Sequence, residues 1–199
     1  MKIRNLLVVL LLLCAPQISS SEGYIFIDYS HGLEASYSES DTVYTERQGA
    51  TIELHRYLSQ RSAYSLGMSL LIKTKMQIEN TTYTSDDWHL NYSSILPFLY
   101  HYDFLQRQRL RLSIGLGFIF ESEFDSALNF DTNFIFRGGP SIEIASLYNF
   151  NDRLALHFAI RPFVNMLSYN IDTDLNSGRF GFNGGRVSAS IGLAYRTIF

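Results

Sequence analysis

The stretch that decides the fold is YSLGMSLLIK, residues 64–73. Large apolar residues occupy every second position from Tyr64 to Ile72, and small or polar residues occupy most of the positions between them. This period of two is typical of a β-strand with two different faces, because successive side chains of a strand point to opposite sides of the sheet. The stretch therefore predicts a strand that has one apolar face.

The same alternation continues along the chain in segments of about ten residues. The expected strands are 24–37, 45–58, 64–73, 88–102, 110–118, 134–148, 154–161 and 187–199. Short links are expected at 59–62, 105–108 and 149–153, and longer polar links at 38–44, 79–87, 122–133 and 170–179. Eight antiparallel strands joined by alternating short and long links, with both chain ends on the short-turn side, predict an all-β up-and-down barrel.

Charged residues gather on the face opposite the apolar one. They are Asp28, Glu34, Glu53, Lys73, Lys75, Arg111, Glu121, Arg137, Glu143, Arg161 and Arg196. A basic side chain facing lipid at mid-depth would cost ~2–4 kcal/mol, whereas opposite charges can pair inside a narrow barrel. We therefore expect a transmembrane barrel with the charged face inside. Because side chains nearly fill an eight-stranded barrel, its interior should be polar and plugged.

Two features favour this membrane barrel over a soluble ligand-binding barrel with its apolar face inside. First, aromatic residues gather near the short-turn ends, as in an interfacial girdle. They include Tyr57, Tyr100, Tyr102, Tyr148 and Phe199. Second, the sequence ends on a strand, where a soluble barrel would usually carry a following helix. After the first 21 residues no apolar run is long enough to predict a transmembrane helix.

The first 21 residues have the order of a cleavable signal peptide. Basic residues precede the apolar run 6–13, and small polar residues follow at 19–21. Cleavage would remove the only cysteine, Cys14, and leave a barrel of residues 22–199. The formal charge is −3 and both signs are mixed along the chain, which argues against a nucleic-acid partner.

The C-terminal stretch is IGLAYRTIF, residues 191–199. Together with the strand count and the loop asymmetry, it resembles the small outer-membrane barrels of the OmpA transmembrane-domain and OmpX type. That resemblance implies the outer membrane of a Gram-negative-type bacterium, contact with its lipid, and insertion by the barrel-assembly machinery. Tyr195 and Phe199 stand at the aromatic positions of the C-terminal signal that this machinery reads. Thr197 stands where that signal commonly has an aromatic or aliphatic residue.

Two details strain the regular alternation. Pro97, Pro140 and Pro162 fall inside expected strands, where each removes a hydrogen bond of the ladder. We expect bulges to resolve this, above all at 138–140, and a bulge would reverse the facing of the residues beyond it. His31 falls on the apolar face of the first strand, which indicates either a register error near Gly32 or contact with a partner.

The predicted interior charge network consists of Glu53, Lys73, Arg111, Arg137, Glu143, Arg161 and Arg196. Glu53 or Glu143 is expected to pair with Arg111, Arg137 or Arg196 and to brace the barrel. An alternative is that the same groups form a gate that changes partners to admit ions. A mature chain without cysteine and without histidines at ligand spacing predicts no metal site and no cofactor.

The leading functional hypothesis is a non-enzymatic barrel with a structural or surface-interaction role, which could include an extracellular ligand at its loops. The main alternative is a narrow channel or a transporter of small hydrophobic compounds, like the OmpW-type barrels, which an apolar lumen would favour. The third is a lipid-modifying outer-membrane enzyme. One deacylase class uses His and Ser two positions apart, and none of the five histidines matches it. Asp87 and His89, near the expected outer rim, remain as a pair that could activate a water.

Overall fold

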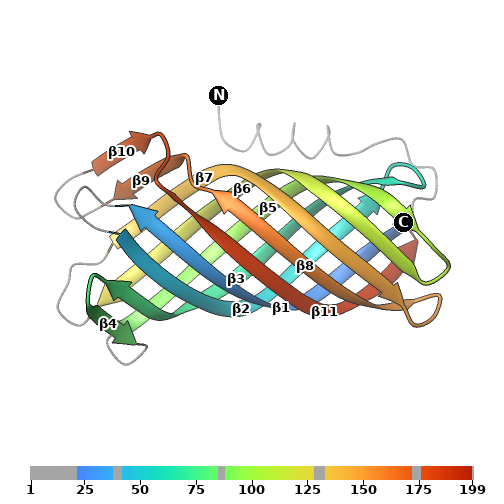
Figure 1. Cartoon of the computed structure of the whole chain (residues 1–199), viewed down its shortest axis with the longest axis horizontal. Coiled ribbons are helices and arrows are strands. Elements are labelled where there is room, and N and C mark those ends of the chain that lie inside the picture. The colour runs from blue at the N-terminus through green and yellow to red at the C-terminus, as the bar shows by residue number, and fades with distance from the viewer. Residues whose placement is uncertain (1–21, 38–41, 85–87, 128–132, 172–175, 199) are drawn as a thin grey trace.

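Backbone pairing closes the sheet on itself in the computed structural model, which describes residues 22–37, 42–84, 88–127, 133–171 and 176–198 (Figure 1). The strands of the barrel are β1 (Glu22–Tyr37), β2 (Thr42–Tyr57), β3 (Ser62–Ile78), β5 (Trp88–Gln106), β6 (Leu110–Ala127), β7 (Asn133–Asn149), β8 (Leu154–Val164) and β11 (Gly184–Ile198). Each pairs antiparallel with the next, and β11 returns to β1. The predicted eight-stranded up-and-down barrel is therefore confirmed.

Three shorter strands lengthen the barrel at one end, on the left in Figure 1. They are β4 (Thr81–Thr84), which pairs with β3, β9 (Leu167–Ile171), which pairs with β7, and β10 (Asn176–Phe180), which pairs with β9. The expected links 79–87 and 170–179 thus contain paired strands, and β6 continues to Ala127 through much of another. Hydrophobic alternation did not mark β4 and β10, because strand pairing continues there although most of their residues are polar or small.

The three short turns lie at the opposite end and carry their own hydrogen bonds. Ser59 Oγ accepts hydrogen bonds from the backbone N–H groups of Arg61 and Ser62, at 3.2 and 3.0 Å. Asn151 Oδ1 accepts from the N–H groups of Arg153 and Leu154, both at 2.9 Å. Such side-chain acceptors explain why these residues form tight turns. Glu22 and Ile198 pair at this same end, which we call the inner end and its opposite the outer end.

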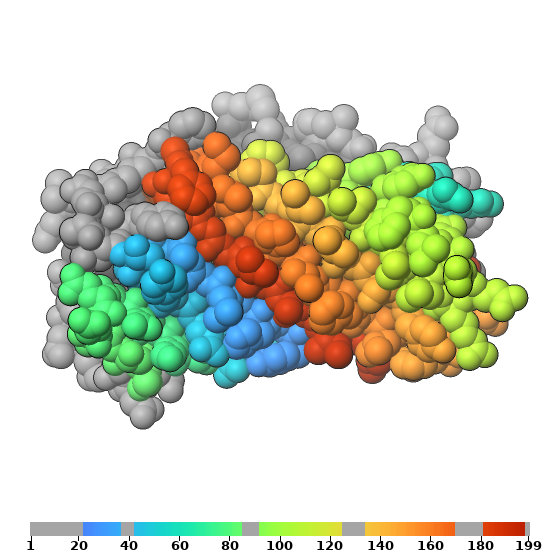
Figure 2. Space-filling view, in the orientation of Figure 1, coloured from blue at the N-terminus to red at the C-terminus, as the bar shows by residue number. Residues whose placement is uncertain are grey.

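The outer face of the barrel is apolar along most of its length. On β3, Leu66, Met68, Leu70 and Ile72 are each half-exposed, while Ser65 and Ser69 are buried. Figure 2 shows the side chains of β7, β8 and β11 as a continuous outer wall, coloured from yellow-orange to red. Because the apolar side chains face outward and the charged ones inward, the barrel is built to be surrounded by lipid.

Outward-facing aromatic residues gather at the inner end, as expected for a girdle. They are Tyr100, Tyr102, Phe104, Tyr148, Phe150 and Tyr195. The prediction for Tyr57 was wrong, because this residue has the inward parity of β2 and its hydroxyl donates to Asp103 Oδ2 at 3.2 Å. Phe199, like the expected signal peptide 1–21, lies outside the described residues. In the part of the chain that the structure describes, no helix is long and apolar enough to cross a membrane.

The prolines interrupt the ladder without the expected bulges. β3 and β5 keep one register on both sides of Pro97, and β7 and β8 keep one register on both sides of Pro162. The pairing of β6 with β7 runs through 138–140 without a shift. A missing N–H thus costs a ladder bond here but does not displace the strand. The register of β7 changes only on its other side, where its partner changes from β8 to β9.

Register shifts fall elsewhere in the barrel. One between Glu46 and Arg47 makes Thr74 the extra residue of β3. Lys75 is consequently exposed rather than inside, which corrects the prediction for that residue. His31 does not mark a register error, since β1 keeps its pairing through Gly32. Its ring faces outward, 3.5 Å from Glu46 Oε1.

Candidate functional site

A dense cluster of charges fills the interior toward the outer end. We call it the outer cluster, and it comprises Glu34, Arg47, Lys73, Glu121, Glu123, Arg137 and Arg186. Glu123 is its centre, because three bases reach this one carboxylate. Their nitrogen-to-oxygen distances to Glu123 are 2.9 Å from Arg47, 3.0 Å from Lys73 and 2.7 Å from Arg137.

The ion pairs of the outer cluster cross the lumen. Arg47 on β2 reaches Glu123 on β6, two strands that are not neighbours in the sheet. Arg186 on β11 likewise reaches Glu121 on β6 at 3.0 Å, and Arg137 on β7 lies 3.1 Å from Glu34 on β1. Arg47, Glu121 and Glu123 are at most 2% exposed. The ion pairs of the cluster therefore span the lumen from one wall of the barrel to the other.

A second cluster lies at the middle of the barrel. We call it the middle cluster, and it comprises Asp28, Glu53, His55, His101, Glu143, His157 and Arg161. Arg161 donates from Nε to Glu143 Oε2 and from Nη2 to Glu53 Oε2, both at 2.6 Å. Since β8 and β2 are not adjacent, this guanidinium also bridges the lumen.

Three histidine rings complete the middle cluster. His55 Nε2 lies 2.8 Å from Glu53 Oε1, and His157 Nδ1 lies 2.7 Å from Asp28 Oδ2. The ring of Phe26 packs between His55 and His157, with centroid distances of 4.2 and 4.4 Å. His55 also packs on His101 at 4.4 Å. These contacts hold the imidazoles in place among three carboxylates.

An apolar layer separates the two clusters. It consists of Leu71, Ile95, Ile119 and Phe163. Along β8, Phe163 lies two residues beyond Arg161, and along β6, Ile119 precedes Glu121, so the layer sits between the middle and outer levels. Arg186 of the outer cluster lies over the ring of Phe163, at 5.3 Å. The two clusters are thus packed against a shared apolar core.

The inner end has a smaller polar set. Glu22 lies 3.0 Å from Arg111 and 3.1 Å from Arg196. The guanidinium of Arg111 lies over the ring of Tyr57, at 4.9 Å from its centroid, and over Tyr24 at 5.9 Å. Arg111 and Arg196 therefore lie at the inner mouth and do not take part in the middle cluster.

The predicted network residues thus separate into three levels, because the tilted strands carry them to different heights. Glu53, Glu143 and Arg161 lie in the middle cluster, Lys73 and Arg137 in the outer cluster, and Arg111 and Arg196 at the inner mouth. The expected pairing of Glu53 or Glu143 with Arg111, Arg137 or Arg196 was wrong. The bridging base is Arg161, because it stands on the strand next to Glu143 and at the height of Glu53.

Sequence reasoning missed Arg47, Glu123, Arg186 and the three interior histidines. Arg186 and Glu123 fell outside the expected strand limits, and Arg47 lay in a part of the second strand with weak alternation. The histidines carried a usable signal. An even number of positions separates His55 from Glu53 and His157 from Arg161, so each histidine points to the same inward face as its charged neighbour. Parity combined with distance from the short turns would have placed them at one level.

Ser65, His101 and Glu143 have the order of a serine–histidine–acid triad, but their setting is not catalytic. Ser65 Oγ lies 2.8 Å from His101 Nε2, and Glu143 Oε1 lies 3.8 Å from His101 Nδ1. Ser65 and Glu143 have no exposed surface and His101 has 1%. A nucleophile needs an approach for the reacting atom of a substrate, and these side chains are sealed from solvent. Of the predicted rim pair, Asp87 lies outside the described residues, as does the side chain of His89.

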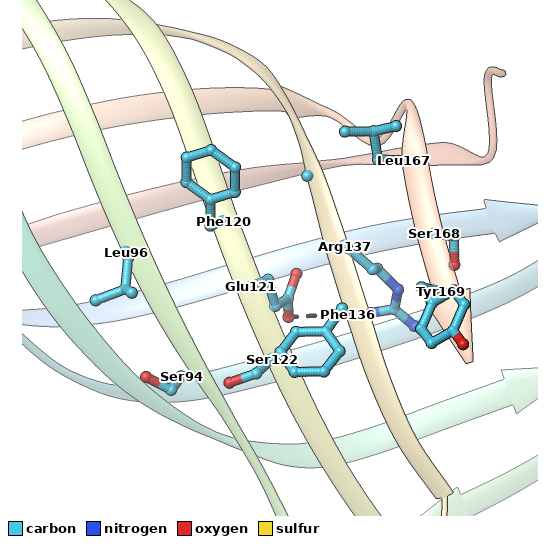
Figure 3. Close-up of a pocket in the computed structure, with 11 residues that line it drawn as sticks. Ser94, Leu96, Phe120, Glu121, Ser122, Phe136, Arg137, Leu167, Ser168 and Tyr169 are labelled. Carbon is cyan, nitrogen blue, oxygen red and sulfur yellow. Dashed lines mark ion pairs between the residues drawn. The ribbon is translucent and has the colours of Figure 1, made fainter. Parts of the chain in front are cut away.

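The outer wall has an apolar pocket of about 510 Å³ next to the point where β7 changes partner (Figure 3). Leu96, Phe120, Phe136, Leu167 and Tyr169 line it. Figure 3 also shows the ion pair between Arg137 and Glu121 of the outer cluster beside these side chains. The pocket thus brings the lipid-facing surface close to the charged interior.

Comparison with known proteins supports the fold directly. No family model and no curated protein matches the sequence. Solved structures do match, among them OprG of Pseudomonas aeruginosa, with a TM-score of 0.64 and 12% identity over 89% of this chain and 96% of that one. The chain has the fold of a small outer-membrane β-barrel.

Two further structures show the same likeness. Neisserial surface protein A matches with a TM-score of 0.59 and 13% identity, over 87% of this chain and 96% of that one. The outer membrane protein AlkL matches with a TM-score of 0.60 and 15% identity, over 93% of each chain. At such identities the likeness concerns the fold alone. With the lipid-facing outer wall, this fold is that of a protein of the Gram-negative outer membrane.

Proposed function

We propose that this protein is a non-enzymatic barrel with a plugged interior, which strengthens the outer membrane and interacts with its surroundings through the outer-end connections. The outer cluster carries this proposal. Its ion pairs link β1, β2, β3, β6, β7 and β11 across the lumen. A continuous set of buried ion pairs fixes the wall strands to one another and leaves no aqueous path.

The absence of a usable catalytic arrangement supports the same proposal. Within the described residues, the arrangement that resembles a triad is sealed inside the barrel around Ser65 and Glu143. No substrate can approach it without unplugging the interior. The connections at the outer end are then the parts of the protein left to contact a ligand outside the cell.

The route to the membrane forms part of the proposal. Residues 1–21 serve as a signal peptide that is removed, and the barrel of residues 22–199 is inserted by the barrel-assembly machinery. Tyr195 supports this step, because its side chain faces outward on the last strand, where an assembly factor can reach it.

Ion conductance in planar bilayers tests the plugged interior. A shift in gel mobility on heating first establishes that the refolded protein is a barrel. We expect no discrete current steps from the wild-type protein, since the outer cluster closes the lumen. Regular steps that change in size in Glu143→Ala would contradict the proposal and favour a gated channel.

A second candidate function is a route for small hydrophobic compounds through the wall, and the apolar pocket favours it. Filling that pocket separates the two functions. Ser122→Trp places a large ring on the pocket lining, whereas Leu116→Trp places the same ring on the same strand outside it. Slower uptake of an alkane or aromatic probe by cells carrying Ser122→Trp, but not Leu116→Trp, would favour transport. Equal uptake by both variants and by wild type supports the structural role.

A further inference from the structure

We propose that the middle cluster contains a site for one divalent metal ion of the zinc class, held by Glu53, His55, His101 and Glu143. One ligand atom from each of these side chains lies within 4.8 Å of the others, and all four residues are buried. Zinc bonds nitrogen and oxygen ligands at about 2.0–2.2 Å, which places tetrahedral ligands about 3.3 Å apart. Small side-chain rotations therefore bring the four atoms to bonding distance.

Two unsatisfied atoms point into this site. His101 Nδ1 and Glu143 Oε1 are buried and have no hydrogen-bond partner within the described part of the chain. They face one another at 3.8 Å, too far for a hydrogen bond and suitable for two ligands of one ion. A buried nitrogen and a buried carboxylate oxygen left without partners cost free energy, and a metal ion satisfies both.

The remaining atoms of these side chains are held as outer-shell contacts of a metal site usually are. Ser65 Oγ lies 2.8 Å from His101 Nε2, and this bond turns His101 Nδ1 toward the cluster. Arg161 donates to the Oε2 atoms of both Glu53 and Glu143, which leaves the two Oε1 atoms directed at the histidines. Each glutamate therefore has one oxygen fixed by the guanidinium and one available to an ion.

Glycine residues make the space for the ligands. A Cβ at Gly115 would lie 2.8 Å from His101 Nδ1 and 3.3 Å from Glu143 Cβ, and one at Gly67 would lie 2.9 Å from Glu53 Cγ. Any larger residue at these two positions would push the ligands out of place.

The charge of the middle cluster also favours a cation. Its fixed charges are three carboxylates, on Asp28, Glu53 and Glu143, against one guanidinium, on Arg161, an excess of two negative charges. A divalent ion balances that excess when the histidine ligands carry no charge. Two imidazole nitrogens with two carboxylate oxygens suit zinc and its neighbours better than calcium or magnesium, which prefer oxygen ligands. This site does not depend on the surface role proposed above.

Metal retention tests the site. The tag-free protein, purified from outer membranes, is unfolded in urea with a chelator and refolded in detergent with Zn²⁺. It is then dialysed against metal-free buffer, and the metal is measured by mass spectrometry. We expect about one zinc ion per folded chain. Refolding with Co²⁺ should give the visible absorption of a four-coordinate ion with nitrogen and oxygen ligands.

Matched histidine variants locate the ion. His101→Gln removes a proposed ligand, and we expect at least a tenfold loss of retained zinc. His157→Gln changes another buried histidine of the same cluster that is outside the ligand set, and it should retain zinc as wild type does. His31→Gln controls for zinc bound at the exposed pair with Glu46. A gel-mobility shift on heating selects folded samples, and His55→Gln replaces His101→Gln if the latter does not fold.

Three outcomes would overturn the site. A folded wild-type protein that retains no zinc contradicts the site directly. Zinc retained by His101→Gln, or lost equally from His157→Gln, places the ion elsewhere. Zinc lost only from His31→Gln identifies surface binding. Conductance results leave these outcomes unchanged, so the metal site and the plugged barrel can fail separately.

Discussion

The outer and middle clusters place different basic groups beside their buried carboxylates. Both bury three carboxylates in the lumen of a lipid-surrounded barrel. The outer cluster sets three guanidiniums and one ammonium against them, whereas the middle cluster has one guanidinium and three histidines. Guanidinium and ammonium groups are fixed cations, whereas a neutral imidazole carries no charge. The outer cluster therefore has one more fixed positive charge than it has carboxylates, whereas the middle cluster has two fewer.

The two clusters also differ in how their carboxylates are paired. Every carboxylate of the outer cluster has a guanidinium or ammonium partner from another strand. In the middle cluster, Glu53 and Glu143 share the guanidinium of Arg161, and Asp28 has the ring of His157. Both clusters contain buried side-chain atoms without a hydrogen bond within the described residues. In the middle cluster, two of these atoms belong to a group of side chains that could hold a metal ion.

The largest effect is expected from breaking the outer cluster at its centre. Glu123→Gln leaves Arg47, Lys73 and Arg137 without their shared carboxylate, and removing one partner of a buried ion pair costs about 3–5 kcal/mol of unfolding free energy. Urea unfolding in detergent, followed by circular dichroism, measures the loss. As the control, Glu46→Gln breaks only the exposed pair with His31 and should cost about 0–1 kcal/mol. Equal losses in the two variants would show that the outer cluster does not brace the barrel.

A smaller effect is expected from crowding the middle cluster. Gly115→Ala forces the His101 ring to move, and overpacking of this kind costs about 1–3 kcal/mol. Gly138→Ala is the matched control, because its new Cβ would meet only ordinary contacts, the nearest 3.6 Å away. Thermal unfolding of the two variants distinguishes them. If Gly115→Ala is as stable as Gly138→Ala, the interior at this level is looser than the structure describes.

The smallest effect is expected for the energetic coupling between the outer and middle clusters. The apolar layer with Ile119 and Phe163 separates them, so Glu123→Gln and Glu53→Gln should have additive effects on unfolding free energy, within about 0.5 kcal/mol. A double-mutant cycle measures this coupling from the two single variants and the double variant. Coupling above about 1 kcal/mol would mean that the two clusters act as one network.

The barrel could be predicted well from the sequence because its signal is local and repeated. The alternation of Leu66, Met68 and Leu70 with small residues predicts the apolar and polar faces of β3 directly. Similar alternation marks the other strands of the eight-stranded barrel. The outward position of the apolar face follows from the cost of charge in lipid. Strand ends were less predictable, as at Ala127, because above the lipid both faces of a strand are polar.

The charged interior was only partly predictable. Parity placed Glu53, Glu143 and Arg161 inside, but parity says nothing about height in the barrel. Pairing across the lumen depends on strand tilt and stagger, which one sequence does not contain. For the same reason, Arg137 was expected beside the wrong carboxylates.

The sequence by itself determined the strand count, the lipid-facing surface and the presence of opposite charges inside, since each follows from a period of two along the chain. Only the tertiary structure decided that Glu53, His55, His101 and Glu143 meet at one level. Those residues stand on β2, β5 and β7, far apart in the sequence, and closure of the barrel is what brings them together. Local alternation sets which way a side chain points, and the shear of the closed sheet sets which side chains it meets.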